Sequence, residues 1–316
     1  MNYFDSGKNE PLVSICCITY NHEPFIREAL NSLLMQKTNF AYKVTIGEDC
    51  STDNTRAICE EYAIKHPKLI NLLPTEKNLG VVHNFTRTLN ACPTKYIALC
   101  EGDDYWTDPY KLQKQVDFLE ANPEYGLIAT GIELIDKEGN SDPPNQMLLS
   151  QRQRAIQEPS FFDLLKGNLI NTLTVCVRAD IIQQLAERAN AQNLWYVIDY
   201  WFWLNIAIDH KIYIMDDVTA AYRVHPEGVS RKSNFLNQRM GWIRFDTISS
   251  FVKRQKSIEY CDYLFLYKSI VGVFRSSSFG SKLWRKTLSF LLKKPTLLLS
   301  LIQGKTRGIS LAKQQN

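Results

Sequence analysis

The chain of 316 residues lacks several patterns that define common protein classes. Its eight cysteines form no CxxC pair and its histidines do not cluster, which argues against a zinc site or a disulfide scaffold. It contains no apolar run of the roughly 18 residues that span a bilayer. Its first ten residues are polar and mixed in charge, unlike a signal peptide. We therefore expect a folded protein of the reducing cytoplasm.

Two nucleotide-binding motifs are also missing. The sequence has no GxxxxGK[ST] loop, and no GxGxxG follows its first apolar run. Their absence disfavours P-loop and dinucleotide-binding proteins. Without a glycine loop or a lysine clamp, a bound diphosphate is best neutralised by a metal ion.

The charges are unevenly distributed. The net charge is +4, but from Tyr263 onward the chain has ten basic residues and no acidic one, so the rest carries −6. In this basic region, apolar clusters at 283–292 and 297–302 alternate with Lys and Arg. The pattern suits an amphipathic segment on an anionic membrane surface, whereas a helix pair packed on the body is the alternative. It is not the pattern of a nucleic-acid groove, and we expect no nucleic-acid partner.

The first half alternates short apolar runs with amphipathic stretches. The runs at 12–18, 44–46, 70–73, 96–100 and 127–129 suit strands that are covered on both faces. Apolar residues at helical spacing lie between them. This order predicts an α/β fold with a doubly wound, Rossmann-like, mainly parallel sheet and flanking helices. The polar stretch 139–153 predicts a loop or hinge.

Polar residues follow three of these runs. They are Thr19 to Asn21, Gly47 to Asp49, and Glu101 to Asp104. In open α/β sheets, ligands bind beyond the carboxyl ends of the strands. Carboxylates that face one crevice repel each other unless a cation lies between them. Because Mn²⁺ and Mg²⁺ accept carboxylate and phosphate oxygens, the sequence predicts a divalent metal holding a diphosphate.

Six segments occur in order over about residues 11–231. They are VSICCITYNHEPFIREALNSLLMQ, IGEDCSTDNT, NLGVVHNF, YIALCEGDDYW, VIDYWFWL and AAYRVHPEGVS. Together they resemble the family 2 glycosyltransferases, which transfer a sugar from a nucleotide diphosphate donor. The resemblance implies a GT-A fold over residues 1–240, with a nucleotide-binding part at about 11–135 and an acceptor-side part at about 150–231. Residues 241–316 are then a helical, basic, amphipathic C-terminal region.

The resemblance implies a metal motif in the segment YIALCEGDDYW. The family has Asp-x-Asp here, and the matching residues are Glu101, Gly102 and Asp103, with Asp103 as the direct metal ligand. Because the first position is Glu, metal contacts of Glu101 and Asp104 stay open, and Asp103 or Asp104 could instead cap the following turn. His225 in the closing segment is implied as a contact of the diphosphate or the metal.

The resemblance also implies a donor site. Its residues are Thr19, Asn21, Asp49, Asn78 and Gly80, together with the metal motif. Thr19 is placed at the base or ribose. Asp49 is matched to recognition of the base, since a carboxylate can accept the N3–H of uracil.

Several of these residues also have a structural interpretation. Asn21 could cap the helix that follows it, and Asp49 could cap the segment 51–52. The glycine turn after residue 77 could be purely conformational. Asp53 is expected to cap a helix, and Arg87 is either a surface residue or a phosphate contact. The four histidines other than His225 receive no role.

The segment VIDYWFWL matches the one that holds the family's catalytic base, which implies Asp199 in that role. A carboxylate can take the proton of an acceptor hydroxyl as the new bond forms. Burying an acid among aromatic residues costs free energy unless the acid is paired or takes part in the reaction. Asp199 could also begin a helix that runs to Ala207. The aromatic residues are expected in the core, with Trp201 or Trp203 as an alternative surface for an acceptor sugar.

The expected function is therefore an inverting, metal-dependent transfer from a UDP-sugar to a glycan or lipid-linked glycan. The expected setting is bacterial surface-polysaccharide or O-antigen assembly, with the basic C-terminal region at the cytoplasmic face of the inner membrane. One alternative is a non-catalytic, membrane-docked scaffold of the same fold. The other is a sugar nucleotidyltransferase, which would need a glycine-rich, basic triphosphate loop near the N-terminus.

Overall fold

The computed structural model describes residues 10–141, 156–192, 194, 199–226, 233–254, 269–270, 272–273 and 281–293. The chain divides into two compact units. The first comprises Met1–Ser160, Asn168–Trp195 and Asp209–Pro226, and the second comprises Phe161–Gly167, Tyr196–Ile208 and Glu227–Asn316. Of the expected loop at 139–153, residues 142–153 lie outside the described ranges.

An eight-stranded sheet forms the centre of the first unit. In spatial order its strands are β3 (Ile70–Leu72), β2 (Tyr42–Glu48), β1 (Val13–Thr19), β4 (Tyr96–Glu101), β7 (Cys176–Arg178), β6 (Tyr125–Ile135), β8 (Lys211–Arg223) and β5 (Tyr105–Trp106). β3, β2, β1 and β4 pair in parallel, as do β6 and β8, whereas β7 and β5 pair antiparallel with their neighbours. The predicted α/β fold with a mainly parallel sheet is confirmed, and β5, β7 and β8 add to the predicted strands.

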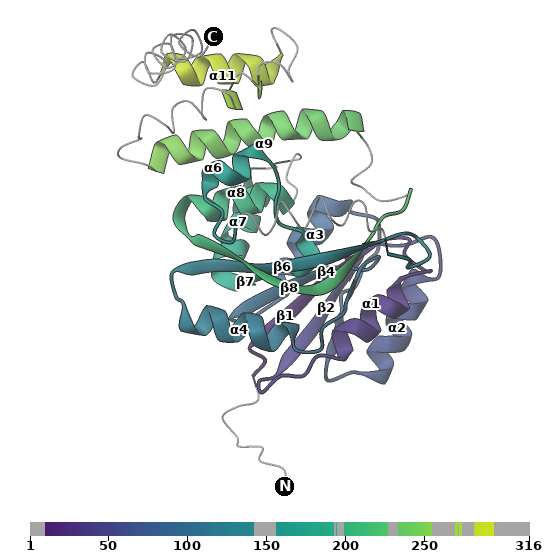
Figure 1. Cartoon of the computed structure of the whole chain (residues 1–316). Coiled ribbons are helices and arrows are strands. Elements are labelled where there is room, and N and C mark those ends of the chain that lie inside the picture. Colours follow the sequence, from purple (N-terminus) through teal and green to yellow (C-terminus); the bar gives the residue numbers. More distant parts are fainter. Residues whose placement is uncertain are drawn as a thin grey trace. The chain divides into compact units, whose positions relative to one another are not determined.

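Helices cover both faces of this sheet. Figure 1 shows α1 (Ile26–Leu34), α2 (Thr55–Lys65) and α4 (Lys111–Ala121) against one face, and α3 (Val81–Asn90) and α7 (Ala179–Ala191) against the other. Successive side chains of a strand point to opposite faces. Accordingly Val13, Ile15 and Cys17 of β1 share an apolar core with Ile26 and Leu30 of α1. Both faces of the strand are buried, which explains its nearly continuous apolar sequence.

β1, β2 and β4 end at the same edge of the sheet. Their register pairs Thr19 with Glu48 and Ile18 with Glu101. The parallel direction of the strands therefore brings together the three polar segments that follow them in the sequence. β8 reaches this edge too, because the carboxylate of Asp104 accepts a hydrogen bond from the N–H of Arg223, the last residue of β8.

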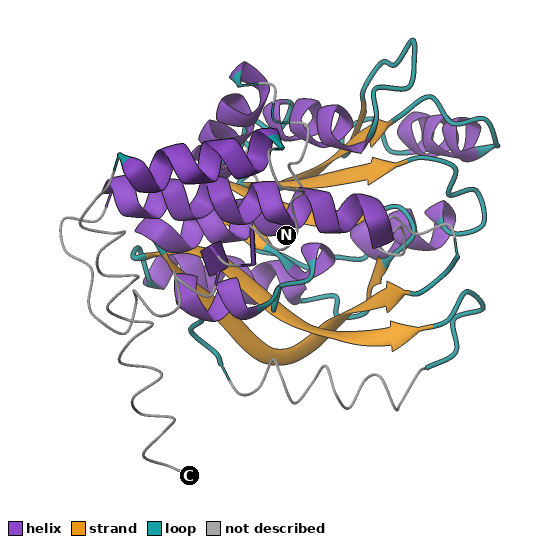
Figure 2. Ribbon diagram, turned by 90° about the horizontal axis from the view of Figure 1, so that it is seen from above, coloured by secondary structure: helices purple, strands orange, loops and turns teal. Residues whose placement is uncertain are grey.

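The described elements of the second unit are helical. They are α6 (Phe161–Lys166), α8 (Asp199–Asp209, of which all but the last residue belong here), α9 (Ser233–Arg254) and α11 (Lys282–Leu292). α8 is buried on all sides, and Trp201 and Trp203 have no exposed surface. The expectation that these aromatics form core is confirmed, and the alternative that either one stacks on a sugar is wrong. α11 runs alongside α9 (Figure 1 and Figure 2).

No helix in the described ranges is both long enough and apolar enough to cross a bilayer.

Candidate functional site

The turn from Glu101 to Asp104 packs closely on the end of β1. The N–H of Gly102 donates to the carbonyl of Ile18 at 2.9 Å. A Cβ added at Gly102 would lie 2.5 Å from Thr19 Oγ1 and 2.7 Å from Thr19 Cβ, so the contact requires glycine. Thr19 is buried, and its hydroxyl has no hydrogen-bond partner within the described part of the chain. Donor contacts of Thr19, Glu101 and Gly102 stay predictions.

Asp103 lies between two histidines. His225 Nε2 is 3.0 Å from Asp103 Oδ2, and His22 Nε2 is 3.6 Å from the same oxygen. Both histidines are largely buried, and the His225 ring packs on Phe25 with centroids 5.2 Å apart. Burial acts to raise the pKa of Asp103, but the hydrogen bond with His225 and the charge of His22 outweigh it and hold that pKa below its ordinary value. The predicted pair Asp103 and His225 is thus in direct contact.

Asp104 points into the protein. It is 4% exposed, and its Oδ1 accepts the N–H of Arg223 at 2.8 Å. Burial, followed by the nearby carboxylates of Asp103 and Glu101, raises its pKa well above the ordinary value. Asp104 therefore supports the turn by tying it to β8.

Arg223 is the cation that holds this turn in place. Its side chain is 4% exposed and lies over the ring of Phe25, with the guanidinium carbon 4.8 Å from the ring centroid. Its Nε donates to the carbonyl of Asp103 at 3.0 Å, and its Nη1 donates to the carbonyl of Lys137 at 2.9 Å. Its Nη2 pairs with Glu28 of α1 at 2.5 Å. One buried side chain thus links the turn, α1 and the segment after β6.

Asp49 fixes a second turn at the same edge. Its Oδ1 accepts the N–H of Leu79 at 2.8 Å, and its Oδ2 accepts the N–H of Gly80 at 2.9 Å. Asn78 Nδ2 donates to the carbonyl of Asp49 at 2.9 Å. Gly80 has a φ of +78°, which favours glycine, and it directly precedes α3. The carboxylate of Asp49 therefore binds the 79–80 turn and not the segment 51–52 that it was expected to cap. Recognition of the base by Asp49 stays a prediction.

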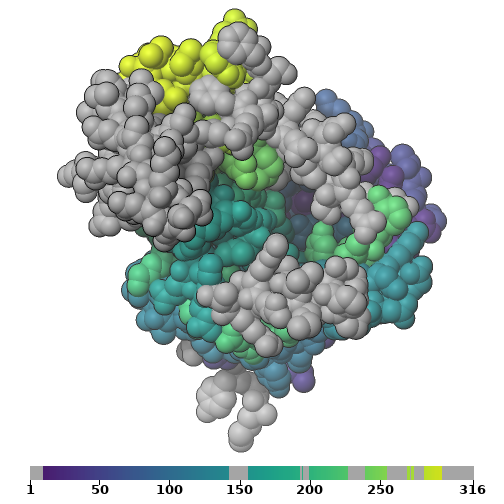
Figure 3. Space-filling model, turned by 45° about the horizontal axis from the view of Figure 1, so that its top comes forward, coloured from purple at the N-terminus to yellow at the C-terminus, as the bar shows by residue number. Residues whose placement is uncertain are grey.

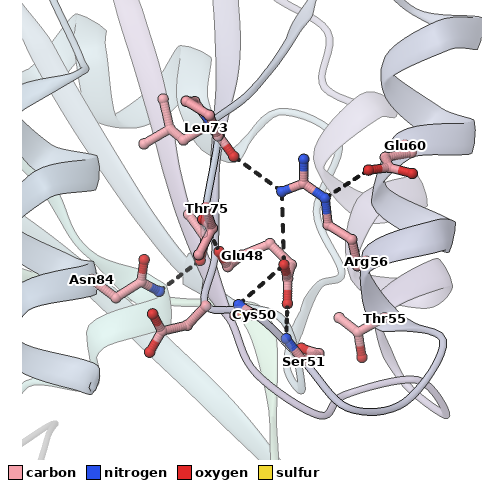
Figure 4. A network of polar contacts seen from close by, with 12 residues as sticks. Glu48, Cys50, Ser51, Thr55, Arg56, Glu60, Leu73, Thr75 and Asn84 are labelled. Carbon is pink, nitrogen blue, oxygen red and sulfur yellow. Dashed lines mark hydrogen bonds and ion pairs between the residues drawn. The ribbon is translucent and has the colours of Figure 1, made fainter. Parts of the chain in front are cut away.

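Glu48 has the capping role that the sequence suggested for its neighbour (Figure 4). It has no exposed surface, and its carboxylate accepts the N–H of Ser51 at 2.7 Å and that of Cys50 at 3.3 Å. Arg56 Nη1 lies 3.7 Å from the same carboxylate and also donates to the carbonyl of Leu73. This network closes the loop between β2 and α2.

Asn21 connects two loops rather than capping α1. Its Oδ1 accepts the N–H of Thr52 at 2.8 Å, and its own N–H donates to Ser51 Oγ at 2.9 Å. α1 has Phe25 as its N-cap residue, without a side-chain cap. Asp53 lies one residue before Asn54, the N-cap residue of α2, and its Oδ1 accepts the N–H of Thr55, the first residue of that helix, at 2.9 Å. A donor contact of Asn21 stays a prediction.

Arg87 is a structural residue. Its guanidinium donates to the carbonyls of Glu48 and Pro74 and to the hydroxyl of Thr75, at 2.6 to 2.9 Å. These bonds hold the segment after β3 against the end of β2. They use the nitrogens with which Arg87 would otherwise reach a phosphate.

Asp199 belongs to the second unit, where it is the first residue of α8. The sequence suggested that it begins a helix, and α8 runs two residues beyond the expected end at Ala207. It is partly exposed and lies in the first turn, where a carboxylate is favoured by the helix dipole. Its role as catalytic base stays a prediction.

The groups around Asp103 offer a divalent cation a partial set of ligands. In the part of the chain that the structure describes, no three His, Cys, Asp or Glu side chains form a ready-made metal cage. Asp103 and His225 nevertheless place one carboxylate and one imidazole at the same point. Cations of the Mg²⁺ class bind through one or two protein ligands plus substrate phosphates. The residues therefore fit a cation whose remaining ligands come from a diphosphate.

Sequence reasoning missed three residues of this region: His22, Glu48 and Arg223. A signal existed for Arg223, since it stands two places before His225 in the same segment, AAYRVHPEGVS. His22 and Glu48 are neighbours of predicted residues, but their contacts depend on how the loops cross. Their roles follow from the folded arrangement of these loops.

Comparison with known proteins identifies the family. A sequence model described as Glycosyl transferase family 2 matches residues 14–198. The chain belongs to this family. An uncharacterized protein of Mycobacterium tuberculosis is 35% identical over 230 residues, which are 73% of this chain and 63% of that protein. The chain thus spans less than two thirds of that relative. TuaG of Bacillus subtilis, named for a glycosyltransferase of teichuronic acid biosynthesis, is 27% identical over 70% of this chain and 82% of its own length.

Solved structures show the same fold as this family 2 chain. TarS of S. aureus in complex with UDP has a TM-score of 0.57 at 20% identity, covering 92% of this chain and 80% of that chain. The mannosyltransferase PcManGT of Pyrobaculum calidifontis, in complex with GDP-Man and Mn²⁺, has a TM-score of 0.56 at 16% identity, covering 95% and 87%. The expected GT-A fold of the family is therefore confirmed.

Proposed function

We propose that this family 2 protein is an inverting glycosyltransferase that moves a sugar from a UDP-sugar to a hydroxyl of a glycan. The observation that carries the proposal is the convergence of Asp103, His22 and His225 where parallel strands end. That edge of an α/β sheet is the place where nucleotides bind. The turn held by Asp49 ends at the same edge.

We assign the donor nucleotide to Thr19, Asn21, Asp49, Asn78 and Gly80, and its diphosphate to Glu101, Gly102 and Asp103. Each carboxylate oxygen has two lone pairs, so Asp49 can accept the N3–H of uracil while it holds its turn. TarS, a protein of the same fold, was solved with UDP. This supports uracil as the base.

Asp103, Glu101 and His225 are the residues we assign to a divalent cation, Mn²⁺ or Mg²⁺. Such a cation, when bound, offsets the negative charge that grows on the departing diphosphate. The contact between Asp103 and His225 orients both side chains toward one point, and Arg223 holds the backbone of Asp103 from behind. PcManGT, of the same fold, was solved with Mn²⁺.

We assign the base to Asp199. An acceptor hydroxyl is a poor nucleophile near neutral pH, and a carboxylate within hydrogen-bond reach can take its proton as the new bond forms. Attack from the face opposite the diphosphate inverts the anomeric centre. The partial exposure of Asp199 suits a group that must meet a substrate.

We propose a glycan or lipid-linked glycan as the acceptor and surface polysaccharide or O-antigen assembly as the setting. The similarity to TuaG, whose name refers to teichuronic acid biosynthesis, supports this class. The basic C-terminal region would hold the enzyme at the cytoplasmic face of the inner membrane.

Nucleotide release tests the proposed function. The full chain is incubated with several UDP-sugars and Mn²⁺, and free UDP is measured with and without a glycan acceptor. We expect UDP release from at least one donor, its loss after chelation by EDTA, and its recovery when Mn²⁺ is added back. An Asp103→Ala variant should lose it as well.

Asp117→Ala is the matched control, because Asp117 is an exposed acid of α4. Release that is equal in the Asp103 and Asp117 variants would contradict the assignment of Asp103. No release from any UDP-sugar, with binding of UDP retained, would favour the scaffold alternative. Formation of pyrophosphate from a sugar phosphate and UTP would instead favour a nucleotidyltransferase.

A further inference from the structure

α11 of the second unit has a buried face that packs on α9. Leu283, Thr287 and Leu291 are buried along one side of the helix. The ring of Phe290 meets that of Phe245 at a centroid distance of 6.1 Å, and the ammonium of Lys286 lies 5.3 Å from the ring centroid of Trp242. α11 is therefore a folded part of the second unit.

The start of α11 is fixed by its own sequence. Ser281 is the N-cap residue, and its hydroxyl accepts the N–H of Trp284 at 3.2 Å. Such a cap satisfies a backbone donor that would otherwise have no partner in the helix. The helix is thus formed before any partner binds to it.

The opposite face of α11 combines leucine and cations. Leu288 and Leu292 are 37% and 63% exposed and stand four residues apart, so they lie on one side of the helix. Lys282, Arg285 and Lys293 are exposed around them. Residues 281–293 contain no acidic residue. Atoms of α11, shown in yellow, are open to view in Figure 3.

A single exposed leucine has no special meaning, but this combination does. An ordinary solvated helix face carries charges of both signs, which pair at a spacing of three or four residues. Here the exposed charge has one sign and borders two aligned leucines. Anionic lipid offers both complements, because its phosphates attract the cations and its acyl region accepts the leucines.

We propose that the exposed face of α11 docks on an anionic bilayer while its buried face stays on α9. The docking residues are Lys282, Arg285, Leu288, Leu292 and Lys293. This inference rests on the proposed function in one respect, since it names the part of the basic C-terminal region that contacts the membrane. The two alternatives for that region, packing on the body and binding a membrane, then describe two faces of one helix.

Vesicle flotation of the full chain tests the docking face. Vesicles of phosphatidylcholine alone are compared with vesicles that also contain phosphatidylglycerol. We expect binding to the mixed vesicles only, and weaker binding as KCl is added, since salt screens exposed charges. One cation near the surface contributes about fivefold to the affinity, so Lys282→Gln/Arg285→Gln/Lys293→Gln should bind roughly 100-fold more weakly.

Two further variants separate docking from general effects of charge. Leu288→Ser/Leu292→Ser should also weaken binding, by about tenfold or more, because both leucines leave the acyl region. Lys43→Gln/Lys65→Gln/Lys68→Gln removes three exposed cations of the first unit and should bind like the unchanged chain. All variants are checked for unchanged thermal unfolding.

Several results would overturn the proposal. They are equal binding to neutral vesicles, equal loss in the Lys43/Lys65/Lys68 variant, and full displacement by millimolar inorganic phosphate, which would indicate a simple anion site. UDP release from a soluble acceptor reaction should persist in every α11 variant. Vesicle binding without UDP release would refute the proposed function alone, and UDP release without vesicle binding would refute the docking alone.

Discussion

The environment of Lys111 strongly affects the ionisation of its side chain. Its side chain, on α4, has no exposed surface. The ammonium donates to Gln115 Oε1 at 2.6 Å and lies 4.3 Å from the ring centroid of Trp106. Burial lowers the pKa of Lys111 from 10.5 to about 8. A cation enclosed in this way costs stability whenever it carries its charge.

A Lys111→Met variant tests this cost. Below pH 8, Lys111 is charged in both states, and the folded state bears the full penalty. Between about pH 8 and 10.5 the folded state has lost a proton that the unfolded state still binds, so the free energy of unfolding rises with pH. We expect the unchanged chain to gain about 3 kcal/mol over Lys111→Met across this window, measured by urea unfolding at each pH. Parallel curves for the two proteins would contradict the prediction.

At this scale, the sequence drew attention to Asp103 and His225 because each stands in a segment that resembles the family, and the structure brings the two side chains into contact. Their roles at a metal and a donor stay predictions. His22 and Glu48 could not be assigned in the same way. Glu48 and Asp49 are adjacent acids. The carboxylate of Glu48 faces the loop before α2, and that of Asp49 faces the turn before α3. The direction of each side chain depends on the path of the backbone after β2. Spacing along the chain carries no information on that choice.

At the scale of elements, the end of β8 and the residues directly after it hold the Glu101–Asp104 turn at two points. Arg223 Nε donates to the carbonyl of Asp103, and His225 bonds the carboxylate of the same residue, each at 3.0 Å. The two residues are separated by one position, so a single strand end sets both the backbone and the side chain of Asp103. Arg223 is a positioning residue in this arrangement.

We expect Arg223→Lys to weaken Mn²⁺ binding in the presence of UDP by about 10- to 100-fold, as changes behind a metal ligand do. A lysine offers one ammonium and cannot reach three acceptors in different directions. Calorimetry well below the melting temperature measures the affinity. Amide exchange of residues 103–106, measured without ligand, should also become faster.

Arg178→Lys is the matched control for this prediction. Arg178 is likewise a partly buried arginine that donates to backbone carbonyls, those of Tyr125 and Leu119, and it lies over the ring of Tyr96 at the start of β4. Its replacement should lower stability and leave Mn²⁺ affinity unchanged. Equal loss of affinity in both variants would mean that Arg223 acts only through stability.

The strands of the sheet differ in how clearly the sequence marks them. The strands of the parallel half are buried on both faces, so their apolar runs stand out in the sequence. β7 and β5 have three and two residues, too few to show any alternation. β8 alternates between buried and exposed positions only in parts, and its final residues are dominated by the contacts of Arg223.

At the scale of the whole molecule, the proposed roles are divided between the two units. Asp103 belongs to the first unit and Asp199 to the second. The sequence placed Asp103 and Asp199 in one domain of residues 1–240, since both stand in segments that resemble the family. The return of the chain to the first unit at Asp209–Pro226 is a property of the folded chain that spacing does not reveal.

Because the two proposed roles belong to different residues in different units, we expect substitutions of Asp199 and Asp103 to cause different defects. Asp199→Asn should bind UDP with nearly normal affinity and lose turnover by about 10² to 10⁴, the contribution of a general base. Asp103→Ala should lose Mn²⁺-dependent UDP binding itself. Calorimetry and steady-state UDP release measure the two effects. Near-normal turnover of Asp199→Asn, or unchanged affinity of Asp103→Ala with and without Mn²⁺, would contradict the corresponding role.

The two outermost strands of the sheet, β3 and β5, have three and two residues. A long bare strand at a sheet margin offers its amides and carbonyls to any passing polypeptide, and this invites fibre formation. At the margin of β3, a partner finds only a few such groups. At the other margin, β5 pairs with the 13-residue β8 only at Ala220 and Ala221, so most of β8 extends beyond this short strand. The protection against polymerisation that a short outermost strand gives therefore applies at the β3 margin.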